Sequence, residues 1–204
     1  MSARIVVLAS GSGTNLQAVL DACAEGILDA TVELVVVNRA GAGAIQRAER
    51  AGVDVVELLL ADRSPQGRRD YDAALAEIVG AARPHWVVLA GWMHILSMSF
   101  LGVFPNRVVN LHPALPGEFA GVDAIRRAWE AGRTGTLTRT GVMVHLVPDE
   151  GVDDGPVLAT AEVPLDPGES LEALTARVHA VEHRLLVDTL AELVAGGGRA
   201  DPGV

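Results

Sequence analysis

Four short, almost purely apolar runs constrain the fold of this chain more than any other feature of its sequence. They are Arg4–Ala9, Val32–Val37, Trp86–Ala90 and Val108–Leu111. Runs in which apolar and polar residues do not alternate are typical of parallel strands that helices cover on both faces. The segments between them carry apolar residues at helical spacing, as in Leu16–Cys23. This order predicts an α/β fold with a mostly parallel, doubly wound sheet and right-handed crossovers.

The segment between the second and third of these runs contains weaker signals. We predict helices at Ala44–Ala51 and Arg69–Ala82, a short strand at Val53–Leu59 and a polar turn at Asp62–Gly67. The helix and strand predictions continue the alternation that a doubly wound sheet requires.

Beyond residue 112 the pattern changes. A helix is predicted over Val122–Ala131, and two strands follow at Thr140–Val147 and Val157–Val163. Their short connection predicts an antiparallel hairpin, and Ser170 is a suitable N-cap for a long last helix. No long linker interrupts the chain, so we predict a single domain over residues 1–195, with halves at about 1–107 and 108–195. Residues 196–204 are predicted to be a flexible tail.

Composition excludes several classes of protein. The net charge of −10 opposes binding to nucleic acid or to an anionic membrane surface. The single cysteine, Cys23, excludes an internal disulfide and a zinc site built from cysteines. No apolar run approaches the roughly 20 residues of a membrane span, and the first residues do not resemble a signal peptide. We therefore expect a cytoplasmic protein.

A polar pair stands where the fourth apolar run ends. Asn110 and His112 alternate with Leu111, so both side chains point to one side of the strand, and Pro113 ends it. The carboxyl ends of strands are where open α/β sheets bind ligands. There the amide can donate to an oxyanion and the imidazole can carry a proton. The alternative is an ordinary turn closed by the asparagine.

A glycine-rich turn follows the first strand. Gly11, Ser12, Gly13, Thr14 and Asn15 lead into a helix, and such a turn presents backbone N–H groups to an anion. The third glycine of a dinucleotide fingerprint and the Gly-Lys-Ser/Thr of a Walker loop are both absent. The turn is therefore either the cradle of a phosphate monoester or a plain strand-to-helix connection.

The segment 148–156 carries four carboxylates, Asp149, Glu150, Asp153 and Asp154. Their spacing does not fit an EF-hand, and we predict no metal site. The open alternatives are a solvated acidic turn and a loop in which one carboxylate faces His112. On its strand, His145 is interpreted as a structural histidine rather than a catalytic one.

Five motifs together resemble a known family. They are Val6–Asn15 (VVLASGSGTN), Val87–Leu96 (VVLAGWMHIL), Val109–Leu115 (VNLHPAL), Gly141–His145 (GVMVH) and Glu150–Pro156 (EGVDDGP). In this order and spacing they resemble the phosphoribosylglycinamide formyltransferases, folate-dependent enzymes of purine synthesis. The resemblance covers roughly residues 4–195, and it implies a Rossmann-like formyltransferase fold.

The resemblance implies roles for particular residues. The catalytic set would be Asn110, His112 and Asp153. The glycine-rich turn Gly11–Asn15 would hold the substrate phosphate in the first half of the domain, and Glu182 and Arg68 would also bind that substrate. We expect the folate to pack between two segments, with contacts from Met93, His94, Ile95, Leu96, Val152 and Asp153. The chain departs from the family at Met93-His94, where many members have Met-Arg, and at Ala114–Gly117.

The implied reaction transfers the formyl group of 10-formyltetrahydrofolate, a co-substrate, to the amine of glycinamide ribonucleotide without a metal. The expected partners are these small molecules, and the protein would be a monomer or a homodimer. Alternatives are a formyltetrahydrofolate hydrolase, another folate-dependent formyltransferase, or a phosphate-binding sensor without formyl transfer.

Overall fold

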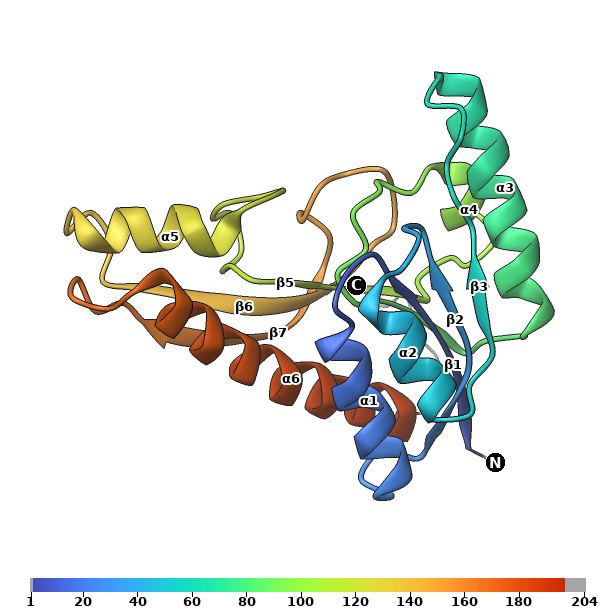
Figure 1. The fold of residues 1–204 in the computed structure, drawn as a ribbon, viewed down its shortest axis with the longest axis horizontal. Helices are drawn as coiled ribbons and strands as arrows, with labels where there is room; N and C mark the ends of the chain where they lie inside the picture. Colours follow the sequence, from blue (N-terminus) through green and yellow to red (C-terminus); the bar gives the residue numbers. More distant parts are fainter. Residues whose placement is uncertain (1, 197–204) are drawn as a thin grey trace.

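A seven-stranded sheet runs through residues 2–196, the part of the chain that the computed structural model describes (Figure 1). The strands are β1 (Ala3–Ala9), β2 (Ala30–Val37), β3 (Val55–Glu57), β4 (Trp86–Leu89), β5 (Val108–His112), β6 (Arg139–Leu146) and β7 (Val157–Pro164). They lie in the order β3-β2-β1-β4-β5-β6-β7. The strands β1 to β5 pair in parallel, whereas β6 pairs antiparallel with both β5 and β7. The predicted fold class and hairpin are confirmed.

Helices cover both faces of the sheet. Their bounds are α1 (Thr14–Ala24), α2 (Gly43–Arg50), α3 (Pro65–Ala81), α4 (Met98–Leu101), α5 (Ala124–Arg133) and α6 (Leu171–Ala195). One apolar cluster joins α1, α2 and α6 to Ile5 and Val7 of β1, and a second joins α3 and α4 to Val6 and Leu8. Successive side chains of β1 point to opposite faces, so one strand supplies both clusters. The helix α6 runs along β6 and β7 and reaches α1 (Figure 1).

Several elements differ from their predicted bounds; α5, for example, begins at Ala124 rather than at Val122. The differences at α3 and β3 have a clear structural cause. The helix α3 begins at Pro65 rather than at Arg69, because the Ser64 Oγ accepts a hydrogen bond from the Gly67 N–H at 3.0 Å and proline suits the first helical position. The predicted turn at 62–67 is therefore partly helix. Strand β3 has only three residues, since it pairs with β2 only at Val35–Val37. The Ser170 N-cap of α6 is confirmed by a hydrogen bond from the Ala173 N–H.

The sheet topology sets the place of the site. From β1 the chain crosses to β2 on one side, and β4 then lies on the other side of β1. The crossover connections leave a crevice at the carboxyl ends of β1 and β4, the usual ligand site of such a sheet. Within residues 2–196, no helix is long and apolar enough to cross a membrane. The predicted tail lies almost entirely outside the described residues.

Candidate active site

A cavity of about 640 Å³ opens at the carboxyl ends of β1, β4 and β5. Among the residues that line it are nearly all of those predicted from the sequence: Gly11–Asn15, Met93–Leu96, Asn110, His112, Val152, Asp153 and Glu182. The fold thus brings the glycine-rich turn, the strand-end pair and the acidic loop to one place. The exception is Arg68, which does not line this cavity.

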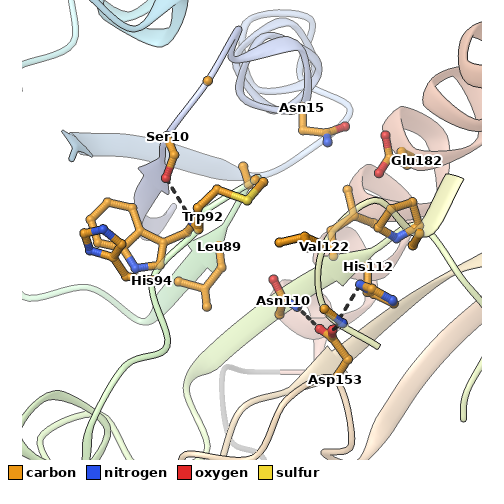
Figure 2. Close-up of a pocket in the computed structure, with 18 of the residues that line it drawn as sticks. Ser10, Asn15, Leu89, Trp92, His94, Asn110, His112, Val122, Asp153 and Glu182 are labelled. Atoms are coloured by element: carbon orange, nitrogen blue, oxygen red, sulfur yellow. Dashed lines mark hydrogen bonds and ion pairs between the residues drawn. The ribbon is translucent and has the colours of Figure 1, made fainter. Parts of the chain in front are cut away.

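Asp153 joins the strand-end pair. Its Oδ1 accepts a hydrogen bond from the Asn110 Nδ2 at 3.1 Å, and its Oδ2 lies 3.2 Å from the His112 Nδ1 (Figure 2). The Oδ2 also accepts from the Gly121 N–H at 2.8 Å. Asp153 has a φ of 55°, a conformation that aspartate tolerates better than most residues. Asp154 is exposed and does not line the cavity.

Burial and neighbouring charged or polar groups have opposite effects on the pKa values of His112 and Asp153. Burial lowers the pKa of His112 below its ordinary value of 6.5, although the Asp153 carboxylate opposes the effect. Burial also acts to raise the pKa of Asp153, but contacts with His145, Gly121 and His112 outweigh it and hold that pKa below its ordinary value. Asp153 is therefore ionised at neutral pH. In a neutral His112 ring, a proton on Nδ1 would face this carboxylate, and Nε2 would then be the basic nitrogen.

His145 belongs to the same group of side chains, which its structural interpretation did not foresee. It lies directly opposite Asn110 in the β5–β6 ladder, and only 2% of its surface is exposed. Its Nε2 is 3.0 Å from the Asn110 Nδ2 and 3.6 Å from the Asp153 Oδ1. Only the register between β5 and β6 reveals this position, because Asn110 and His145 are 35 residues apart in sequence.

The glycine-rich turn forms the other end of the cavity. Gly13 adopts a φ of 74° as the N-cap of α1, and a β-carbon there would come within 2.7 Å of the Ala44 Cα. A glycine is required at this position both by the backbone conformation and by the close approach of α2. The first N–H groups of α1 have no partners within the helix and face this end, where the helix dipole favours an anion.

Glu182 reaches the same end of the cavity from α6. Figure 2 shows Glu182 and Asn15 facing each other. The glutamate is 6% exposed, and burial raises its pKa to about 7 against a smaller opposing effect of Asn15. The His179 Nε2 lies 3.8 Å from the Glu182 Oε2. The carboxyl group can therefore donate as well as accept hydrogen bonds near neutral pH.

The segment predicted to contact the folate forms a third wall. Met93 and Ile95 are about half exposed and Leu96 is buried, so apolar surface faces the cavity. The Met93 N–H donates to the Ser10 Oγ at 2.9 Å, which ties this wall to the end of β1. Arg68, in the first turn of α3, donates to the Ile95 carbonyl and thereby holds the wall from outside. The His94 ring packs edge-on against Tyr71 and Trp92.

The arrangement suits acyl transfer. An amide donor, a neutral imidazole and an ionised carboxylate meet at one end of the cavity, and an anion-binding helix terminus lies at the other. Within residues 2–196, no group of three or more His, Cys, Asp or Glu side chains is arranged to hold a metal ion. The absence of a metal from the reaction stays a prediction.

Comparisons with known proteins identify relatives over nearly the whole chain. A model of the family described as Formyl transferase matches residues 3–190. The phosphoribosylglycinamide formyltransferase of Schizosaccharomyces pombe is 44% identical over an alignment of 204 positions, which covers 95% of this chain and 98% of that protein. The Escherichia coli protein of the same name is 39% identical over 181 residues, which cover 89% of this chain and 82% of that protein.

A solved structure agrees with these relatives. The glycinamide ribonucleotide transformylase 1 of Symbiobacterium toebii superposes with a TM-score of 0.87 at 41% identity, over 96% of this chain and 89% of that one. The resemblance predicted from the five motifs is confirmed. Since the family model spans most of the chain and the relatives are similar along its length, this chain belongs to the formyl transferase family.

Proposed function

We propose that the chain transfers the formyl group of 10-formyltetrahydrofolate to the amine of glycinamide ribonucleotide. The observation that carries the proposal is the cluster of Asn110, His112 and Asp153 in a cavity that also contains an anion-binding helix terminus. Two substrates must meet at such a cluster, and the cavity has a separate wall for each. The names of the relatives support the same activity.

The ribonucleotide would bind at the glycine-rich end. Its phosphate would accept hydrogen bonds from backbone N–H groups of Gly11–Asn15, and the buried Glu182 would bind the part of the substrate next to the phosphate. In a chain of net charge −10, such fixed donors offset the unfavourable field that an anion meets. Arg68 would contribute indirectly, because it holds the Ile95 carbonyl rather than facing the cavity.

The folate would lie between the 91–96 segment and the 148–153 loop. Met93, Ile95, Leu96 and Val152 offer an apolar surface to a flat heterocycle, and His94 and Asp153 stand at its edges. This arrangement would bring the formyl carbon to the strand-end pair.

The reaction would pass through a tetrahedral intermediate. The substrate amine attacks the formyl carbon, and the bond from that carbon to N10 of the folate then breaks. The amine loses one proton and N10 gains one, so no net proton is exchanged. His112, paired with Asp153, would carry the proton, through a water if needed, and such assistance typically contributes about 10² to 10⁴ in rate. Asn110 would donate to the oxyanion, which is worth about 10² to 10³.

One assay separates this function from its alternatives. Purified protein is mixed with 10-formyltetrahydrofolate, and the deformylated folate is followed with and without glycinamide ribonucleotide. A formyltransferase requires the ribonucleotide and yields the formylated product in equal amount. Deformylation without the ribonucleotide would indicate a hydrolase, and phosphate binding without any deformylation would indicate a sensor. Cytoplasmic location and the choice between monomer and homodimer stay predictions.

A further inference from the structure

The protonation of His145 follows from its neighbours. The His145 Nδ1 lies 2.8 Å from the Leu146 carbonyl oxygen, which can only accept a hydrogen bond, so Nδ1 carries a proton. The His145 Nε2 lies 3.0 Å from the Asn110 Nδ2, which can only donate. The Nε2 atom must therefore be the acceptor. In this arrangement both nitrogens of the ring are engaged, and Nε2 also lies 3.6 Å from the Asp153 Oδ1.

This ring also decides how the Asn110 carboxamide is oriented. The carboxamide nitrogen has two protons; one faces the His145 Nε2, and the other faces the Asp153 Oδ1 at 3.1 Å. A 180° flip would bring the carboxamide oxygen against two acceptors, which is unfavourable. Figure 2 accordingly shows the Asn110 oxygen pointing away from Asp153. Both N–H groups that could stabilise an oxyanion are thus held by acceptors of the protein.

We propose that His145 is a positioning residue of the formyl transfer, which holds one Asn110 N–H until the oxyanion of the tetrahedral intermediate takes it. This inference rests on the proposed function. A neutral formyl oxygen competes poorly with the His145 Nε2 for this N–H. An oxyanion competes well, because hydrogen bonds to charged acceptors are roughly twice as strong. This Asn110 N–H therefore stabilises the transition state but not the bound substrate. Such an interaction raises kcat and does not strengthen substrate binding.

The first test compares variants of His145 with a control on the same strand. In His145→Leu the acceptor is lost and the carboxamide is free to turn, so we expect kcat to fall about tenfold, as for the loss of one hydrogen bond, while both KM values stay within about twofold. His145→Gln, whose side-chain oxygen can reach the former Nε2 position, should restore most of kcat. Thr140→Val removes another fully buried polar group of β6 away from the cavity and should leave both parameters unchanged.

A double-mutant cycle separates positioning from general damage. In an Asn110→Ala background, His145→Leu should have no further effect on kcat, since the side chain that it acts through is gone. An equal loss in both backgrounds would overturn the proposal, and so would a loss in Thr140→Val as large as that in His145→Leu.

The tautomer gives a readout that does not depend on activity. Nitrogen-15 NMR of the wild-type protein should find the His145 ring protonated at Nδ1 and unprotonated at Nε2. A proton on Nε2 would overturn the inference even if formyl transfer is observed. Failure of the wild-type protein to transfer formyl groups would instead refute the proposed function, and with it the positioning role of His145.

Discussion

At one end of the cavity, five consecutive residues form the anion-binding turn, whereas at the other end the reactive group is assembled from segments far apart in sequence. The turn Gly11–Asn15 lines the cavity, and in our proposal it binds the phosphate through its backbone N–H groups. The reactive group joins Asn110 to His145 across 35 residues and to Asp153 across 43. Binding is thus built from local backbone geometry and chemistry from long-range side-chain contacts, so substitutions at the two ends should affect different kinetic parameters.

The largest effect is expected at the reactive end. Asp153→Asn removes the charge beside His112, and we expect kcat to fall by about 10² to 10⁴, with both KM values nearly unchanged. Steady-state kinetics with each substrate varied in turn would measure this. Asp154→Asn is the matched control, because that carboxylate is exposed and outside the cavity. Equal damage by Asp154→Asn would contradict the assignment and move the catalytic carboxylate by one position.

A variant at the glycine-rich end should give the opposite pattern. Gly13→Val is a poor choice, because a β-carbon there collides with Ala44, but a β-carbon at Gly11 meets open space. Gly11 lines the cavity, so we expect the methyl group of Gly11→Ala to hinder the approach of the phosphate. The KM for the ribonucleotide should rise about tenfold, as when one hydrogen bond to a charged group is weakened, and kcat and the folate KM should not change. Gly80→Ala, in α3 and equally unobstructed, should change neither KM. An unchanged KM for the ribonucleotide in Gly11→Ala would show that the phosphate does not bind at this turn.

The raised pKa of Glu182, at the glycine-rich end of the cavity, should make the free energy of unfolding depend on pH. In the unfolded chain this carboxyl ionises near its ordinary pKa of 4.5, whereas burial keeps it protonated up to about 7 in the fold. The folded state therefore binds more protons between these values, and its free energy of unfolding falls as the pH rises through this window. Glu182→Gln should be more stable than the wild type at about pH 8. Each pKa unit is worth about 1.4 kcal/mol, so the gain is a few kcal/mol at most.

Denaturant unfolding of both proteins at about pH 5 and about pH 8 would measure this difference. A variant that gains no stability at the higher pH would show that Glu182 ionises normally.

The smallest expected effect is a change in the pKa of His112. Burial holds this pKa below 6.5, while Asp153 raises it in part. The acid limb of the kcat/KM profile should therefore lie below pH 6.5, because the neutral ring is the active form. In Asp153→Asn the pKa should fall further, which proton NMR titration of the His112 ring can follow. A higher pKa in that variant would mean that the two groups do not interact as the 3.2 Å contact implies.

The contrast between the two ends also explains what could be predicted from the sequence. The sheet, its hairpin and the turn Gly11–Asn15 follow from local periodicity and local turn chemistry, and the structure contains them. The start of α3 was missed although its signal was local, since Ser64 and Pro65 form a standard capping pair. The strand-end pair could be located from alternation, but its junction with Asp153 required the family resemblance.

His145 shows why the positions of some site residues could not be predicted from the sequence. Its place opposite Asn110 depends on the β5–β6 register, and the sequence of either strand does not fix that register. Arg68 is a second example: its side chain donates to the carbonyl of Ile95, 27 residues away, and does not line the cavity. Long-range packing sets both positions, and a single sequence encodes it only indirectly.

The contacts of Asp153 have a mechanical consequence. One carboxylate connects the 148–156 loop to Asn110 and His112 of β5 and, through the Gly121 N–H, to the loop before α5. All three segments line the cavity, so they cannot move apart without breaking contacts of the group to which we assign the chemistry. We therefore expect that any form in which these segments separate would lack the complete reactive group and would be inactive.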